Sequence, residues 1–264
     1  MYSNESSSCT GNPPTRRGYD AAKALFEGKL KGLKRRDLDS ALRVVFDDQR
    51  KRLAEYLNLP SGAEIIFCPS GSDAEYIPVA MAKSLHPTKK IANGVTQLNE
   101  IGAGTALAST GEFFSTYAPF LGANDEKYLS GFEGINGCVV PARTSDGEII
   151  DASEKMNEYC AQQLEQQNFP IIHGVFGGKT GVRDDVMPGS LEAGDKSFGV
   201  VDACQGRFSL EEMNEWMEQD SLVLFTTSKF YQVSAYQVHI MFISVAMQQL
   251  NERLTNEVHL SIKL

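Results

Sequence analysis

The chain has 264 residues, a formal net charge of -9, a pI of about 5.0 and a hydrophobic share of 42%. That share is typical of a globular chain with a packed core, and the acidic balance argues against a nucleic-acid-binding surface. Five widely spaced cysteines without a CxxC pair argue against a disulfide scaffold and against a metal site, and favour a reducing compartment. The N-terminus lacks a secretory signal pattern, so we expect a cytoplasmic protein, with organelle targeting left open.

The first part of the chain is predicted to be a flexible arm followed by a helix. Residues 1–18 are rich in serine and show no hydrophobic period. From Leu38 to Leu57, apolar residues recur at spacings of three and four, which predicts an amphipathic helix. The turn residues of 60–62 then lead into a short apolar strand over 64–68.

A Ser-Gly-Ser turn separates this strand from a second predicted helix over 74–85. The first N–H groups of a helix lack intrahelical partners, so such a turn can bind a phosphate. Gly71 lets the backbone approach an anion, and the hydroxyls of Ser70 and Ser72 can donate hydrogen bonds. The alternative is that Ser72 or Asp73 only caps the helix.

The middle of the chain continues the alternation of strands and helices. We predict strands over 90–95, 138–141 and 170–176, a helix over 153–167, and glycine-containing loops around 98–105 and 177–182. His173 lies inside an apolar run and is expected to be a core histidine. Lys179 and Arg183 follow the strand that contains it and are candidates to face an anionic group.

The stretch from 198 to 231 carries the residues with the clearest chemistry. An apolar strand over 198–201 ends on Asp202, and Gln205 follows. A polar helix over 209–219, with a serine at its N-cap position, comes next. A second apolar run over 221–225 then leads to Lys229, so an acid follows one strand and a lysine follows the next.

This order of elements predicts an α/β fold with a mostly parallel sheet and helices on both faces. In such a sheet, ligands bind outside the carboxyl ends of the strands, where Asp202 and Lys229 would meet. A lysine amine and a carboxylate are the pair that pyridoxal phosphate chemistry uses, one for the aldehyde and one for the ring nitrogen. The apolar segment 238–245 is too short to cross a bilayer, and no membrane span is expected.

Four segments occur in the order found in fold-type I pyridoxal phosphate enzymes, and the chain resembles the aminotransferase class V and cysteine desulfurase group. The matching segments are FCPSGSDAEYIPVAMA, VVPARTSDGEIID, GGKTGV and VVDACQGR. The resemblance implies that Asp202 pairs with the pyridine nitrogen of pyridoxal 5'-phosphate and that Gln205 binds its phenolic oxygen. Lys229 falls where the Schiff-base lysine of the group is expected, and would form the internal aldimine.

The same resemblance implies that Gly71 and Ser72 hold the cofactor phosphate with help from Thr227. It implies an enzyme of the transferase or lyase type, acting on an amino acid or amine, and a homodimer. An alternative is a truncated, non-catalytic remnant that still binds cofactor. A further alternative is a nucleotide-binding α/β protein that uses Gly71 or the pair Gly177-Gly178.

Two departures from the group stand out. The group has a ring-stacking histidine or aromatic residue after an early strand, where this chain has Asn99-Glu100. Beyond Gln232 the sequence no longer resembles the group. We therefore expect a domain over 19–232 that includes an N-terminal helical segment, an atypical tail over 233–264 and no C-terminal small domain.

Overall fold

The computed structural model describes residues 14–115, 117–118, 122–123, 126–184, 196–227, 229 and 239–243. Of 117–118, 122–123 and 239–243, only the strand backbone is described. Within these ranges, no helix combines the length and the apolar character needed to cross a membrane. The predicted arm over residues 1–18 lies mostly outside the described part of the chain.

The centre of the fold is a sheet in the strand order β1-β9-β8-β7-β6-β2-β5. Strands β5, β2, β6, β7 and β8 run parallel, and β9 is antiparallel to both of its neighbours, so β1 runs in the same direction as β8. The strands are β1 (Glu64–Cys68), β2 (Ile91–Val95), β5 (Asn136–Val139), β6 (Phe169–Val175), β7 (Phe198–Asp202), β8 (Leu222–Thr226) and β9 (His239–Ile243). A separate pair, β3 (Tyr117–Ala118) and β4 (Gly122–Ala123), is antiparallel.

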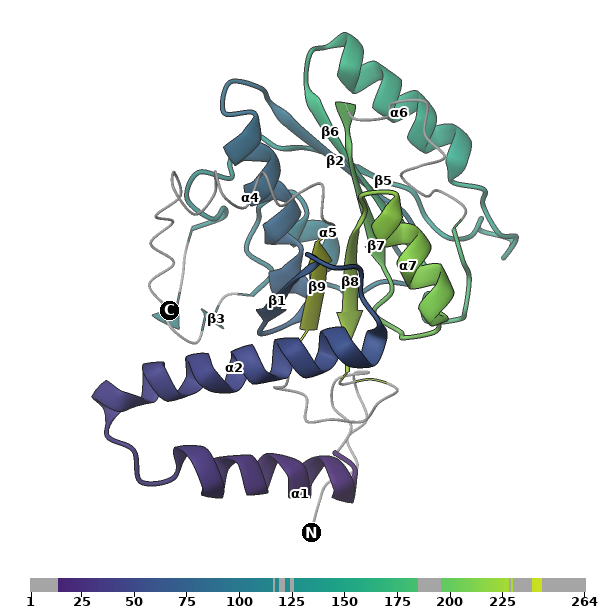
Figure 1. Cartoon of the computed structure of the whole chain (residues 1–264). Helices are drawn as coiled ribbons and strands as arrows, with labels where there is room; N and C mark the ends of the chain where they lie inside the picture. Colours follow the sequence, from purple (N-terminus) through teal and green to yellow (C-terminus); the bar gives the residue numbers. More distant parts are fainter. Residues whose placement is uncertain are drawn as a thin grey trace.

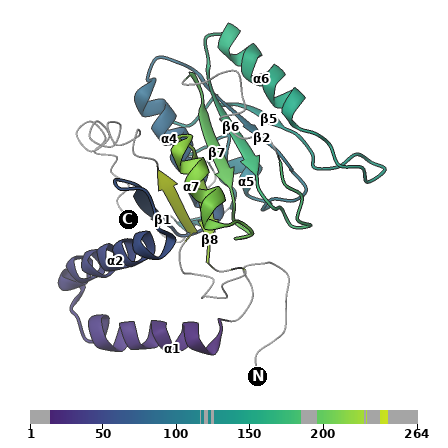
Figure 2. The same ribbon diagram turned by 45° about the vertical axis from the view of Figure 1, so that its right-hand side comes forward.

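Helices lie on both faces of the sheet, as Figures 1 and 2 show. The N-terminal helices form a hairpin in which α1 and α2 lie side by side, next to the β1–β9–β8 part of the sheet. The helices are α1 (Arg16–Leu25), the π-helix η1 (Phe26–Leu30), α2 (Arg35–Leu57), α3 (Gly71–Ala74), α4 (Tyr76–Leu85), α5 (Thr105–Ala108), α6 (Ser153–Glu165) and α7 (Leu210–Glu218).

The strand residues alternate between two buried layers, because successive side chains of a strand point to opposite faces. On one face, Ile171 of β6 and Val200 of β7 pack with Val79 of α4. On the other face, Val201 and its neighbours pack against α2 and α7, and Ile172 packs against α6. Both faces are therefore covered, which explains why β6, β7 and β8 read as continuous apolar runs.

The predicted fold class is confirmed, and most elements lie close to their predicted bounds. The strand over 64–68 is β1, and Ser209 is the N-cap of α7, where it forms a capping box with Glu212. Some bounds differ, and β5 spans Asn136–Val139, two residues earlier than predicted. Helical structure after β1 begins at Gly71 rather than Ala74, because Ser70 is the N-cap. The expected tail contributes β9, which pairs with β1 and β8 inside the main sheet.

Candidate functional site at the carboxyl edge of the sheet

The carboxyl ends of β1, β2, β6, β7 and β8 lie at one edge of the sheet, because these strands run in the same direction. Ligands of open α/β sheets bind outside this edge. The segments that carry the predicted site residues all leave the sheet here. The Ser-Gly-Ser turn follows β1, Asp202 ends β7, and Thr227 and Lys229 follow β8.

Asp202 is a buried carboxylate held in one orientation. Asp202 is 7% exposed, and its Oδ1 accepts a hydrogen bond from the Cys204 amide at 2.9 Å. Its Oδ2 lies 3.8 Å from Nε2 of His173. Burial alone raises the pKa of Asp202, but His173, the charge of Lys229 and the side chain of Cys204 outweigh it, so the pKa lies well below its usual range.

Lys229 is half-buried, and its charge contributes to the low pKa of Asp202. The structure therefore brings the predicted acid and the predicted amine into electrostatic contact. Gln205, in the loop after β7, is buried at 7% exposure, and Thr227 is half-buried directly after β8. Helix α3, which begins at Gly71, packs against β8 and β9.

The Ser-Gly-Ser turn has two roles for its two serines. Ser70 caps α3, since its Oγ accepts from the Asp73 amide at 3.1 Å and donates to Asp73 Oδ2 at 2.5 Å. The cap of this helix is therefore Ser70, and the alternative that Ser72 or Asp73 caps it is wrong. Ser72 lies inside the first turn, and its Oγ is so close to Gly104 that a Cβ there would lie 2.6 Å from it. Burial raises the pKa of Asp73, whose carboxyl group is turned toward Ser70.

Hydrogen bonds join the loop after β2 to the loop after β6. Gln97 has a left-handed backbone (φ 51°), and its Nε2 donates to the carbonyl oxygens of Val175 at 3.1 Å and Val182 at 3.2 Å. Glu100 accepts hydrogen bonds from the amide and the hydroxyl of Thr180. No aromatic residue occurs from Thr96 to Gly104, so this segment supplies polar anchors where the resembled group has a stacking ring.

The glycines of these loops serve close packing of one loop on another. A Cβ at Gly178 would lie 2.5 Å from Gln97 Oε1 and 2.6 Å from Glu100 Cβ. Arg183, a candidate to face an anion, instead pairs with Glu212 of α7 at 3.1 Å and lies over the ring of Phe176. We therefore withdraw Arg183 as an anion-binding residue. Lys179 is exposed on the same loop.

Two buried charged residues lie beside Asp202: His173, which is the core histidine that the sequence predicts, and Glu75, which the sequence did not single out. His173 is fully buried on β6, and its Nδ1 lies 3.0 Å from Oε2 of Glu75, which is 2% exposed between α3 and α4. Burial alone lowers the pKa of His173, but Glu75 and Asp202 raise it to about 10. A histidine inside a buried apolar strand requires a polar partner. The sequence therefore indicates that His173 has such a partner, but it does not indicate which residue that partner is.

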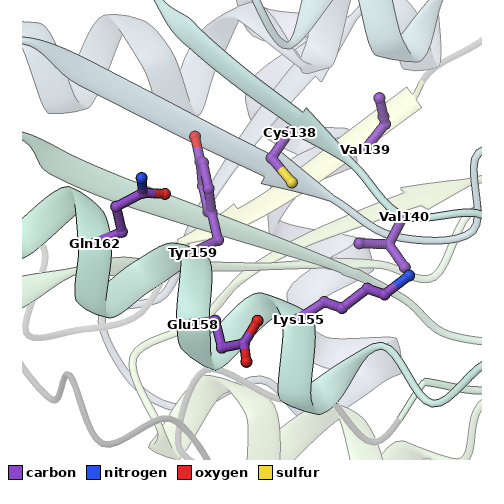
Figure 3. Close-up of a pocket in the computed structure, with 7 residues that line it drawn as sticks. All are labelled: Cys138, Val139, Val140, Lys155, Glu158, Tyr159 and Gln162. Carbon is purple, nitrogen blue, oxygen red and sulfur yellow. The ribbon is translucent and has the colours of Figure 1, made fainter.

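A separate groove lies between β5 and α6 (Figure 3). Its volume is about 520 Å³, and Cys138 and Val140 line it from the strand side while Lys155 and Tyr159 line it from the helix. Strand β5 is the edge strand, and β2 and β6 separate it from β7. This groove is therefore remote from Asp202 and takes no part in the site at the carboxyl edge.

The fold has counterparts among solved structures. The chain is similar to the glutamate decarboxylase domain of the diaminobutyrate-pyruvate transaminase and L-2,4-diaminobutyrate decarboxylase from Vibrio parahaemolyticus (TM-score 0.62, 14% identity, 94% of this chain and 53% of that one). It is similar to the histidinol-phosphate aminotransferase from Clostridium acetobutylicum (TM-score 0.53, 10% identity, 94% of this chain and 61% of that one). It is also similar to Oryza sativa TDC with PLP (TM-score 0.53, 13% identity, 76% of this chain and 44% of that one).

These likenesses show the fold alone, an α/β fold that the chain shares with those decarboxylases and aminotransferases. The chain spans about half the length of the structures it matches. No protein-family model matches the sequence, and no curated protein matches it.

Proposed function

We propose that this chain binds pyridoxal 5'-phosphate at the carboxyl edge of its sheet and acts on an amino acid or amine. The observation that carries the proposal is the buried carboxylate of Asp202, held ionised within the electrostatic reach of Lys229. A permanently ionised carboxylate suits a protonated ring nitrogen, and a neighbouring amine suits the aldehyde of the cofactor.

The donor set at this edge matches the three polar parts of the cofactor. Asp202 would face the ring nitrogen, and Lys229 would bond to the aldehyde carbon. Gly71 and Ser72, at the start of α3, would bind the phosphate together with Thr227. Gln205, buried near Asp202 in the loop after β7, would donate to the phenolic oxygen.

Pyridoxal phosphate, when bound, supplies an aldehyde that condenses with amines and a ring that accepts the electrons released at the substrate Cα. The residues of this chain supply the remaining functions. Asp202 keeps the ring nitrogen protonated, since its own pKa is too low for it to take that proton. The amine of Lys229 would move the Cα proton of the substrate.

Transamination and elimination both begin with this proton transfer, so the proposal covers an aminotransferase or a lyase. The fold alone does not select between them, because one fold hosts many reactions. A homodimer, which the family resemblance implies, belongs to the same proposal. The homodimer is tested by measuring the mass of the purified protein in solution with and without cofactor.

Titration of the purified chain with pyridoxal phosphate tests the proposal and separates binding from turnover. We expect a visible absorbance band that saturates at one cofactor per chain, with loss of the band in Lys229→Ala. The control is Lys155→Ala, because Lys155 is exposed on α6, away from the site. The absorbance band of this variant should equal that of the unmodified chain. A band that persists in Lys229→Ala, or the absence of any band, contradicts the proposal.

A further inference from the structure

Three buried charged groups adjoin one another at the carboxyl edge of the sheet, and we call them the charged line, in the order Glu75, His173 and Asp202. Glu75 is 2% exposed, His173 is 0% exposed and Asp202 is 7% exposed. Nδ1 of His173 lies 3.0 Å from Glu75 Oε2, and its Nε2 lies 3.8 Å from Asp202 Oδ2. Each nitrogen of the imidazole therefore faces a carboxylate, and ligand oxygens of Glu75 and Asp202 lie within 4.8 Å of each other.

The line follows from the strand register and from the face on which α4 packs. Ile171 and Val200 both face the layer that contains α4. Two residues further along each parallel strand, His173 and Asp202 point to the same side, because side chains alternate with period two. Glu75 lies at the junction between α3 and α4, on that same side.

A His173 that carries a proton on each nitrogen balances the charge of one of the two carboxylates it faces. A buried carboxylate without a positive partner is strongly unfavourable, and Glu75 is as deeply buried as the histidine it contacts. With a cationic His173, the three groups together carry one net negative charge. A single protonated ring nitrogen neutralises that charge.

We propose that Glu75 and His173 are positioning residues that hold Asp202 as an oriented anion for the ring nitrogen of the cofactor. Glu75 contacts His173 and acts on Asp202 through it. The inference rests on the proposed function for its purpose. The charge state of His173, by contrast, is a property of the chain itself.

The other charged or titratable groups around the line agree with this arrangement. Cys204 follows β7, and burial holds its pKa well above the usual value, so it stays a neutral thiol whose amide binds Asp202. Lys229 adds a positive charge that lowers the pKa of Asp202. The neighbouring strand β2 contributes no titratable residue to the described surroundings.

A bound metal ion is the alternative explanation for two carboxylates and one imidazole in contact. The ligand atoms of Glu75, His173 and Asp202 lie within 4.8 Å of one another. A metal requires a neutral imidazole with a lone pair directed at the ion, whereas the proposed line requires an imidazolium. The protonation state of His173 therefore separates the two explanations.

Nitrogen NMR of the histidine side chains in the cofactor-free 264-residue chain is the first test. The chain has four histidines, and a His173→Gln sample assigns the signal of His173. We expect one imidazole that is protonated on both nitrogens at pH 8, with no change on addition of EDTA. A neutral His173 at pH 8, or stoichiometric metal in the purified chain, overturns the proposal.

The second test uses Glu75→Gln, which keeps the shape of the side chain and removes its charge. We expect His173 to lose its second proton at a lower pH, and the affinity for pyridoxal phosphate to fall about tenfold, the equivalent of one pKa unit. The control Glu215→Gln changes an exposed residue of α7 and should change neither. An unchanged titration of His173 in Glu75→Gln overturns the proposal.

The two proposals can fail separately. If His173 is cationic and responds to Glu75→Gln while the chain does not bind pyridoxal phosphate, the proposed function is wrong and the charged line stands. If the chain binds the cofactor at Lys229 and His173 is neutral, the charged line is wrong and the proposed function stands.

Discussion

Raising the pH should weaken the fold through the loss of one buried proton. The ordinary pKa of a histidine is 6.5, and the two carboxylates raise that of His173 to about 10. Because the folded-state pKa is the higher one, the stabilisation is complete below pH 6.5 and is lost as the pH rises toward 10. Between pH 6.5 and pH 9 the free energy of unfolding should fall by about 3 kcal/mol, at about 1.4 kcal/mol for each pH unit.

Other buried groups set the upper limit of the pH range in which this loss of stability can be assigned to His173. Burial raises the pKa of Cys68, and that of Tyr76, to about 12, so above pH 9 these groups add losses of the same sign. Glu75 belongs to the same coupled unit, because burial raises its pKa too. The predicted loss below pH 9 is therefore that of the Glu75–His173 pair.

Urea unfolding followed by the fluorescence of Trp216 is a suitable assay. Trp216 is the single tryptophan of the chain, and it is buried in contact with the rings of Phe176 and Phe208. In Glu75→Gln the loss between pH 6.5 and pH 9 should shrink to about half or less, because His173 then faces one carboxylate rather than two.

The control is His86→Gln. His86 stacks on Phe169, and burial lowers its pKa, so its proton affects stability only below pH 6.5. This variant should keep the full loss above that pH. A free energy of unfolding that stays constant from pH 6.5 to pH 9 in the unmodified chain refutes the reasoning, as does an undiminished loss in Glu75→Gln.

Three further predictions concern single positions. Gly104→Ala places a Cβ 2.6 Å from Ser72 Oγ, so cofactor titration should show weaker binding; unchanged affinity argues against Ser72 as a phosphate ligand. Ser209→Ala removes the capping box with Glu212 and should lower the free energy of unfolding by about 1 kcal/mol in urea; no loss means that the cap is not stabilising. Met156→Ala empties a fully buried position on the inner face of α6 and should cost about 2–5 kcal/mol in the same assay; a cost below about 1 kcal/mol means that the site collapses.

The sequence was sufficient for the strands that are covered on both faces. The runs ending at Asp202 and Phe225 are short, apolar and rich in β-branched residues, which is the pattern of central parallel strands. The capping box at Ser209 was also readable, because it depends on residues three positions apart. Strand β5 was placed two residues late, since it is an edge strand with exposed side chains and a weak pattern.

The charged line behind Asp202 was not readable from the sequence. Glu75 and His173 are 98 positions apart in the numbering, and only the packing of α4 on β6 brings them together. The tie between Glu100 and Thr180 is of the same kind, because it joins loops that follow different strands. Local periodicity predicts elements; contacts between their ends depend on strand order.

The measurement that tests the central claim most directly is borohydride reduction of the chain with bound pyridoxal phosphate, followed by peptide mass analysis. The account predicts one pyridoxyl phosphate group per chain, attached to Lys229, and no modification of that peptide in Lys229→Ala. Attachment spread over exposed lysines such as Lys179 and Lys155, with Lys229 unmodified, would contradict it.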